Sequence, residues 1–92
     1  MSNFRWINKQ GVESDLGFIV QFTGRFTAEY REAGRIFVVD VEDGGLSGDK
    51  SNILYSRSSL LRFIPSQSEQ QRVETNFRDA MLFQGLVPVA YA

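Results

Sequence analysis

The chain has 92 residues, a length that predicts one domain, residues 1–92, with a single hydrophobic core. Apolar residues make up 42% of the chain and eight residues are Phe, which is typical of globular rather than disordered proteins. The lack of Cys and His excludes disulfides, thiol nucleophiles, imidazole bases and the commonest zinc ligands. Ten basic and eleven acidic residues give a net charge of −1, so charge alone does not predict nucleic-acid binding.

Residues 1–16 carry little structural signal. They lack an apolar segment of signal-peptide length, and the apolar stretch that follows is interrupted by Gly17 and Gln21. We therefore expect no membrane segment, and the lack of Cys agrees with a cytoplasmic location. Residues 4–7 fit either a short strand or a tail that packs Trp6 on the core. Residues 1–16 are accordingly either part of the domain or a loosely attached N-terminal extension.

Three strands are predicted between residues 17 and 42. Residues 17–23 are rich in β-branched and aromatic side chains, which favours a strand. Apolar and polar side chains alternate along residues 25–32, which predicts a second strand with one buried and one solvated face. The buried face would consist of Phe26, Ala28 and Tyr30, and the solvated face of Arg25, Thr27, Glu29 and Arg31. Gly34 closes a hairpin because glycine adopts the positive φ of a short turn. Residues 35–42 return as the partner strand. Its valines favour a central position in which both faces of the strand are partly buried.

The segment after this hairpin is less regular. A polar loop is expected after Asp43-Gly44-Gly45, running to Lys50, and residues 52–55 then predict a strand. Residues 60–64 fit either a strand or a short helical turn, and Pro65 ends that stretch.

A long helix and a last strand complete the chain. Ser66 is a good N-cap with Glu69 completing a capping box, and Gly85 supplies a C-cap after about Gln84. An apolar stripe recurs at helical spacing: Val73, Phe77, Ala80, Met81 and Gln84. Residues 86–91 predict a strand that Pro88 confines to a sheet edge. The predicted fold class is α+β, an antiparallel sheet of about five to six short strands covered on one face by one long C-terminal helix and followed by a final edge strand.

Carboxylates gather between residues 40 and 49: they are Asp40, Glu42, Asp43 and Asp49, with no cation before Lys50. Their spacing does not fit an EF-hand loop, so no metal is expected. A catalytic carboxylate pair would have no His and no Lys nearer than Lys50, so we expect neither an enzyme nor a cofactor. The negative field of these residues instead favours a basic partner and disfavours nucleic acid.

The solvated side of the predicted hairpin is a second candidate surface. Its arginines could bind nucleic acid, but Glu29 and Glu32 lie between them. Cross-strand charge pairing on a wet face accounts for this pattern better. Glu29 and Arg31 are therefore the competing candidates for contact with a protein partner.

Several short motifs together resemble a known pattern. They are Tyr30-Arg31-Glu32-Ala33-Gly34-Arg35, the valine-rich strand to Glu42, Leu54-Tyr55, Ser59-Leu60, Pro65 and Ala80-Met81-Leu82-Phe83-Gln84-Gly85. Over about residues 17–89 the chain is similar to a small family of immunity proteins from bacterial polymorphic-toxin loci. Members of that class protect a cell against toxins delivered by contact-dependent inhibition and related routes. The chain has Phe63-Ile64 where the pattern has a Trp before the proline.

The resemblance implies a cytoplasmic protein that binds one cognate toxin domain and blocks its active site or a partner that the toxin needs. The family has no catalytic residues that could be assigned to positions of this chain. Together with the carboxylates, it predicts a basic, nuclease-like toxin domain. A function of another class stays open, namely an assembly module that forms a homodimer or a larger homo-oligomer through an exposed sheet edge.

Overall fold

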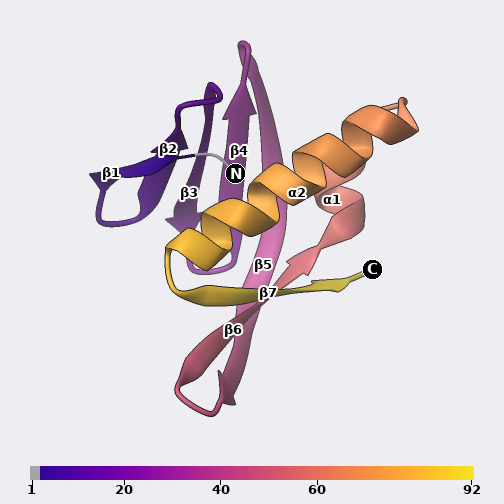
Figure 1. Cartoon of the computed structure of the whole chain (residues 1–92). Helices are drawn as coiled ribbons and strands as arrows, with labels where there is room; N and C mark the ends of the chain where they lie inside the picture. The colour runs from indigo at the N-terminus through magenta and orange to yellow at the C-terminus, as the bar shows by residue number, and fades with distance from the viewer. Residues whose placement is uncertain (1–2) are drawn as a thin grey trace.

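A computed structural model describes residues 3–92, which form seven strands and two helices (Figure 1). In chain order the elements are β1 (Phe4–Asn8), β2 (Gly11–Ser14), β3 (Phe18–Gly24), β4 (Thr27–Glu32), β5 (Arg35–Ser47), β6 (Lys50–Ser56), α1 (Arg57–Leu61), α2 (Gln67–Phe83) and β7 (Leu86–Tyr91). The seven strands belong to one sheet, and α2 crosses one of its faces. The α+β class is confirmed, but the sheet has seven strands rather than the five or six expected.

The strands follow one another across the sheet in chain order, from β1 to β7. Neighbouring strands are antiparallel except for β6 and β7, which are parallel. A parallel pair needs a long crossover connection, and α1 and α2 provide it. Among the described strands β7 pairs with β6 alone, so the predicted edge position of the last strand is confirmed.

β5 is shared by two parts of the sheet. Its first half pairs with β4 as far as Asp40, and its second half pairs with β6 from Val41 onward. At the point of change, the backbone N–H of Asp40 donates a hydrogen bond of 3.0 Å to the hydroxyl of Ser59 in α1. A side chain thus replaces the missing neighbouring strand, which keeps this backbone donor satisfied.

The prediction of a polar loop between Gly45 and Lys50 is wrong for most of its length, because β5 continues to Ser47 and β6 starts at Lys50. Two glycines shape this extension. A Cβ added to Gly44 would lie 3.0 Å from the Cβ of Asn52, so a larger residue would require the neighbouring side chains to shift. Gly45 has a φ of 78° and sits in a bulge of β5. Glycines that bend a strand resemble loop glycines in the sequence, which explains the error.

The N-terminal part contributes two strands to the sheet. Residues 4–14 form β1 and β2, and the side chain of Val12 is fully buried. Phe4 packs edge-on against Phe18, with ring centroids 5.7 Å apart. Of the two alternatives for residues 60–64, the helical one is closer, because α1 spans Arg57–Leu61.

The strand predicted over residues 25–32 begins two residues later, as β4 at Thr27. Residues 25 and 26 instead form the turn after β3. The prediction that Phe26 is buried is therefore wrong: its side chain is 58% exposed, and the guanidinium of Arg25 stacks over its ring. The rest of the alternation is confirmed, with Ala28 and Tyr30 fully buried.

α2 forms as its capping residues predict. The Ser66 hydroxyl accepts a hydrogen bond of 3.4 Å from the backbone N–H of Glu69. Beyond the other end, Gly85 has a φ of 83°, the left-handed conformation of a helix C-cap. The predicted apolar stripe faces the sheet, and four of its members are fully buried: Val73, Phe77, Ala80 and Met81. This stripe and the inner face of the sheet form the core.

Replacing Phe77 by Ala tests whether α2 holds this core together. The ring of Phe77 is fully buried and lies 5.1 Å from that of Tyr55 between centroids. We expect the free energy of unfolding, measured by urea denaturation, to fall by about 3–5 kcal/mol. The control is Leu82→Ala on the same helix, where the side chain is 55% exposed and the loss should stay below about 1 kcal/mol. Similar small losses in both variants would contradict the proposed packing of α2.

Candidate functional site

Arginine side chains neutralise almost every glutamate of the protein. The ion pairs include Arg5 with Glu13, Arg31 with Glu29, Arg35 with Glu69, Arg57 with Glu74, and Arg72 with Glu32. Within residues 3–92, Glu42 is the one glutamate without such a pair. The same ion pairs leave out Asp40, Asp43 and Asp49. Asp15 and Asp79 are also outside these ion pairs, so four of the six unpaired side-chain carboxylates among residues 3–92 lie on β5 and on the turn that follows it.

The ion pairs of Glu32 and Glu69 tie α2 to the hairpin of β4 and β5. Arg72 donates to both carboxylate oxygens of Glu32, at 2.5 and 3.0 Å, and Arg35 donates to Glu69 at 2.7 Å. The hydrogen bonds from Arg72 lower the pKa of Glu32 below its usual 4.5, although partial burial acts in the opposite direction. These carboxylates are engaged in holding the helix and are not free to bind a partner.

Two tyrosine hydroxyls lie between α2 and the sheet. The side-chain amide of Asn76 donates a 3.0 Å hydrogen bond to the hydroxyl of Tyr30, and burial raises the pKa of Tyr30 to about 12. The Tyr55 hydroxyl donates to Glu74 at 2.7 Å and accepts from Arg78 at 3.1 Å, and burial raises its pKa as well. Both hydroxyls therefore stay protonated at neutral pH. They are suited to joining the helix to the sheet rather than to acting as a base or nucleophile.

The carboxylates predicted as one cluster do not share one surface, although all four are exposed. Asp40 and Glu42 alternate with the buried Val39 and Val41, so they point away from the core. Asp43 lies on the other side of the strand, where its carboxylate accepts a hydrogen bond of 2.8 Å from the backbone N–H of Gly45. Asp49 lies in the turn between β5 and β6. In residues 3–92 no group of three or more carboxylates is placed to hold a metal ion.

The face of the sheet opposite to α2, here called the open face, carries residues of both candidate sites from the sequence. It consists of Ile19, Gln21, Thr27, Glu29, Arg31, Ile36, Val38, Asp40 and Glu42. The register of β4 and β5 sets Thr27 beside Asp40, Glu29 beside Val38, and Arg31 beside Ile36. Directly opposed residues point to the same side of a sheet, so the acidic residues of β5 and the charged pair of β4 share one surface.

Exposed apolar side chains at the centre of the open face were not predicted. Ile36 is 53% exposed and Val38 is 54% exposed, which corrects the expectation that the valines of β5 are partly covered on both faces. The pattern was present in the sequence, since Ile36 and Val38 alternate with the buried Phe37 and Val39. Only the position of α2 on the opposite face shows that these side chains remain uncovered.

A shallow hollow of about 310 Å³ marks one end of the open face. Its apolar lining comes from Ile19 and Ile36, and the rest comes from Gly17, the turn residues Ala33 and Gly34, and four charged side chains: Glu13, Arg31, Glu32 and Arg35. The charged lining residues are all in ion pairs, Arg31 with Glu29, Glu13 with Arg5, and Glu32 with Arg35 and Arg72. An apolar group fits such a place better than an ion does.

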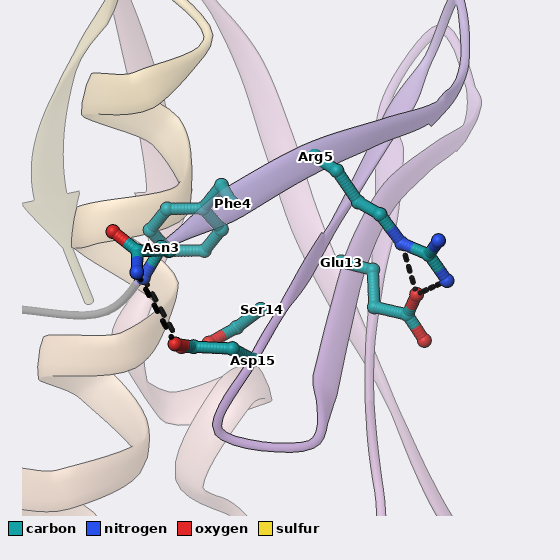
Figure 2. Close-up of a pocket in the computed structure, with 6 residues that line it drawn as sticks. All are labelled: Asn3, Phe4, Arg5, Glu13, Ser14 and Asp15. Atoms are coloured by element: carbon teal, nitrogen blue, oxygen red, sulfur yellow. Dashed lines mark hydrogen bonds and ion pairs between the residues drawn. The ribbon is translucent and has the colours of Figure 1, made fainter.

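A second hollow, of about 330 Å³, lies between β1 and β2 (Figure 2). Its polar groups bond to one another: Asn3 donates to the carboxylate of Asp15 from its backbone N–H at 3.1 Å, and Arg5 donates to Glu13 from Nε at 2.8 Å. Polar groups that are already hydrogen-bonded to one another bind a ligand weakly, because the ligand would have to break these hydrogen bonds. We therefore rank this hollow below the open face.

The free edge of β1 presents aromatic side chains. Trp6 is 52% exposed and lies 6.0 Å from the ring of Phe83, which is 44% exposed. The carbonyl of Asn3 accepts from the backbone N–H of Asp15, and hydrogen-bonded pairs alternate along an antiparallel ladder. The backbone groups of Phe4 and Trp6 therefore point away from β2 and are available to another strand.

Comparison of the chain with models of protein families, with curated proteins and with solved structures gives no match. In the part of the chain that the structure describes, no helix combines the length and the apolar character needed to cross a membrane. The functional argument therefore depends on the chemistry of the surfaces themselves.

The Glu32 ion pair predicts a specific dependence of stability on pH. Because the pKa of Glu32 in the folded state is below 4.5, this carboxylate stabilises the fold above pH 4.5, and the contribution is lost as the pH falls through the folded-state pKa. We expect Glu32→Gln to lower the unfolding free energy at neutral pH and to weaken the loss of stability on acidification. Urea denaturation at a series of pH values measures the unfolding free energy and its dependence on pH. The control is Asp79→Asn.

A Glu32→Gln stability profile that coincides with that of the wild type would show that the ion pair of Glu32 and Arg72 does not contribute to stability.

Proposed function

We propose that this protein is a cytoplasmic immunity protein that binds one cognate bacterial toxin domain and neutralises it by forming a protein–protein complex. The observation that carries the proposal is the exposed pair of carboxylates on the open face, Asp40 and Glu42, which are the charges of that face without an ion-pair partner among residues 3–92. The resemblance of the sequence to polymorphic-toxin immunity proteins supports the same function.

The charge of this surface suits a basic toxin of the nuclease type. A nuclease presents cations to the phosphates of its substrate, and carboxylates can occupy the place of those phosphates. Unpaired charges act over a Debye length of about 8 Å in physiological salt, so they accelerate encounter with a basic partner and oppose binding to nucleic acid. Asp43 and Asp49 add to this field from the hairpin of β5 and β6.

A non-enzymatic role agrees with the side chains available. The chain has no His and no Cys, five of its six glutamates are paired with arginines, and its buried tyrosines are hydrogen-bonded. Blocking a toxin needs none of these groups as a catalyst. It requires a stable surface of matching shape and charge.

The experiment is to purify this protein with the toxin domain encoded beside its gene and to measure their affinity and the survival of cells that produce both. We expect a stable complex and protected cells. Glu42→Lys should weaken binding by about 2–5 kcal/mol if its carboxylate is buried against toxin cations. The matched control is Asp79→Lys, the same reversal on α2, which should change affinity by less than about 1 kcal/mol.

Two results would contradict the proposal. One is a locus that encodes no such toxin, and the other is a purified pair that does not bind. If Glu42→Lys and Asp79→Lys weakened the complex equally, the effect would reflect the net charge of the protein. The carboxylates of β5 would then have no specific part in binding.

A second candidate function is a homo-oligomeric assembly module, and the free edge of β1 is the observation that favours it. The other sheet edge, β7, contains Pro88, which cannot donate a ladder hydrogen bond. β1 has no proline and carries the exposed Trp6. Sedimentation of the isolated protein distinguishes the two functions: assembly predicts a dimer that Trp6→Arg dissociates, whereas the immunity function requires no dimer.

A further inference from the structure

We infer that the toxin domain docks on the open face, with Ile36 and Val38 at the centre of the interface, and not on the tip of the β5–β6 hairpin. This inference rests on the proposed function and adds the contact surface and the chemistry that the partner must present. A suitable partner carries an apolar side chain for the hollow beside Ile36 and basic side chains opposite Asp40 and Glu42.

The apolar content of the open face supports a protein partner. Ile36 and Val38 are neighbours on the same side of β5, and each is more than half exposed. Ile19 lies on the same face two strands away, with Arg31 between it and Ile36. The centre of a protein interface is typically apolar and depleted of charge, whereas its rim is polar.

The hollow between Ile19 and Ile36 provides room for an anchoring side chain. Its volume of about 310 Å³ exceeds that of any single side chain, so an aromatic or branched group can enter it. Residues that dominate binding energy typically fill pockets of this kind. Val38 lies directly between this hollow and the carboxylates, where a docked partner would cover it.

The charges of the open face determine which partner fits. Glu29 is paired with Arg31, so the uncompensated charge comes from Asp40 and Glu42. At about 3.3 Å per residue along a strand, these carboxylates lie about 13 and 20 Å from Ile36. The partner must therefore place cations at that distance from its apolar anchor.

The same charges argue against other occupants. A second copy of this chain stacked on the open face would bring the unpaired carboxylates of both molecules into one interface, which is unfavourable. Nucleic acid is repelled for the same reason. The hairpin tip also carries Asp49 and the 74% exposed Leu46, but none of the hollows described above lies there.

The test measures the affinity of the purified toxin domain for Val38→Arg and for Leu82→Arg. The two positions are matched, because Val38 is 54% and Leu82 55% exposed, and both variants gain one positive charge. Val38 lies on the open face and Leu82 on α2. We expect Val38→Arg to raise the dissociation constant about 30-fold or more and Leu82→Arg to change it by less than about threefold. Melting curves establish that both variants fold, and Ile36→Ala replaces Val38→Arg if the latter does not.

The outcomes separate this inference from the proposed function. If wild type binds the toxin and the open-face variant binds equally well, the inference is overturned and the immunity function stands. Stronger losses for Leu82→Arg would also overturn it and place the interface on the helix side. If wild type does not bind the toxin, the proposed function and this inference fall together.

Discussion

The alternation of side chains along β5 is the constraint on which the rest of the structure depends. This strand is 13 residues long, and it pairs with β4 in its first half and with β6 in its second. Phe37, Val39 and Val41 lie on one side and complete the core. Because side chains of a strand point to opposite faces in turn, the residues between them are forced outward. The core and the proposed binding surface are therefore two sides of one strand.

Only one of the two sheet faces is covered, because residues 3–92 contain a single helix long enough to cross the sheet (Figure 1). α2 is held at its start by the ion pairs of Arg72 and Arg35, and along its length by the buried stripe around Phe77. The parallel return of β7 beside β6 follows from this crossover. The core and the proposed binding surface thus lie on different faces of the sheet, so substitutions on the open face should leave the contacts of the core in place.

Local patterns predicted the parts of the fold that local interactions determine. The capping box of Ser66 and Glu69 located the start of α2, and the turn at Ala33 and Gly34 forms with positive φ at both residues, 50° and 79°. β2 was missed because it has four residues with Val12 as its one fully buried apolar side chain, and its pairing is long-range. The candidate residues Glu29, Arg31, Asp40 and Glu42 were identified individually. That they share a surface with Ile36 and Val38 depends on strand register and on the position of α2, neither of which a single sequence determines.

A methyl NMR spectrum of the Ile, Leu and Val side chains, recorded with and without the unlabelled toxin domain, tests the central claim most directly. The account predicts that the methyl signals of Ile19, Ile36 and Val38 shift or broaden on binding. The signals of Val73 in the core and of Leu82 on α2 should stay in place, since both lie on the other side of the sheet. Changes at Leu46 or Leu82, with Ile36 and Val38 unaffected, would contradict the claim that the open face of the sheet is the binding surface.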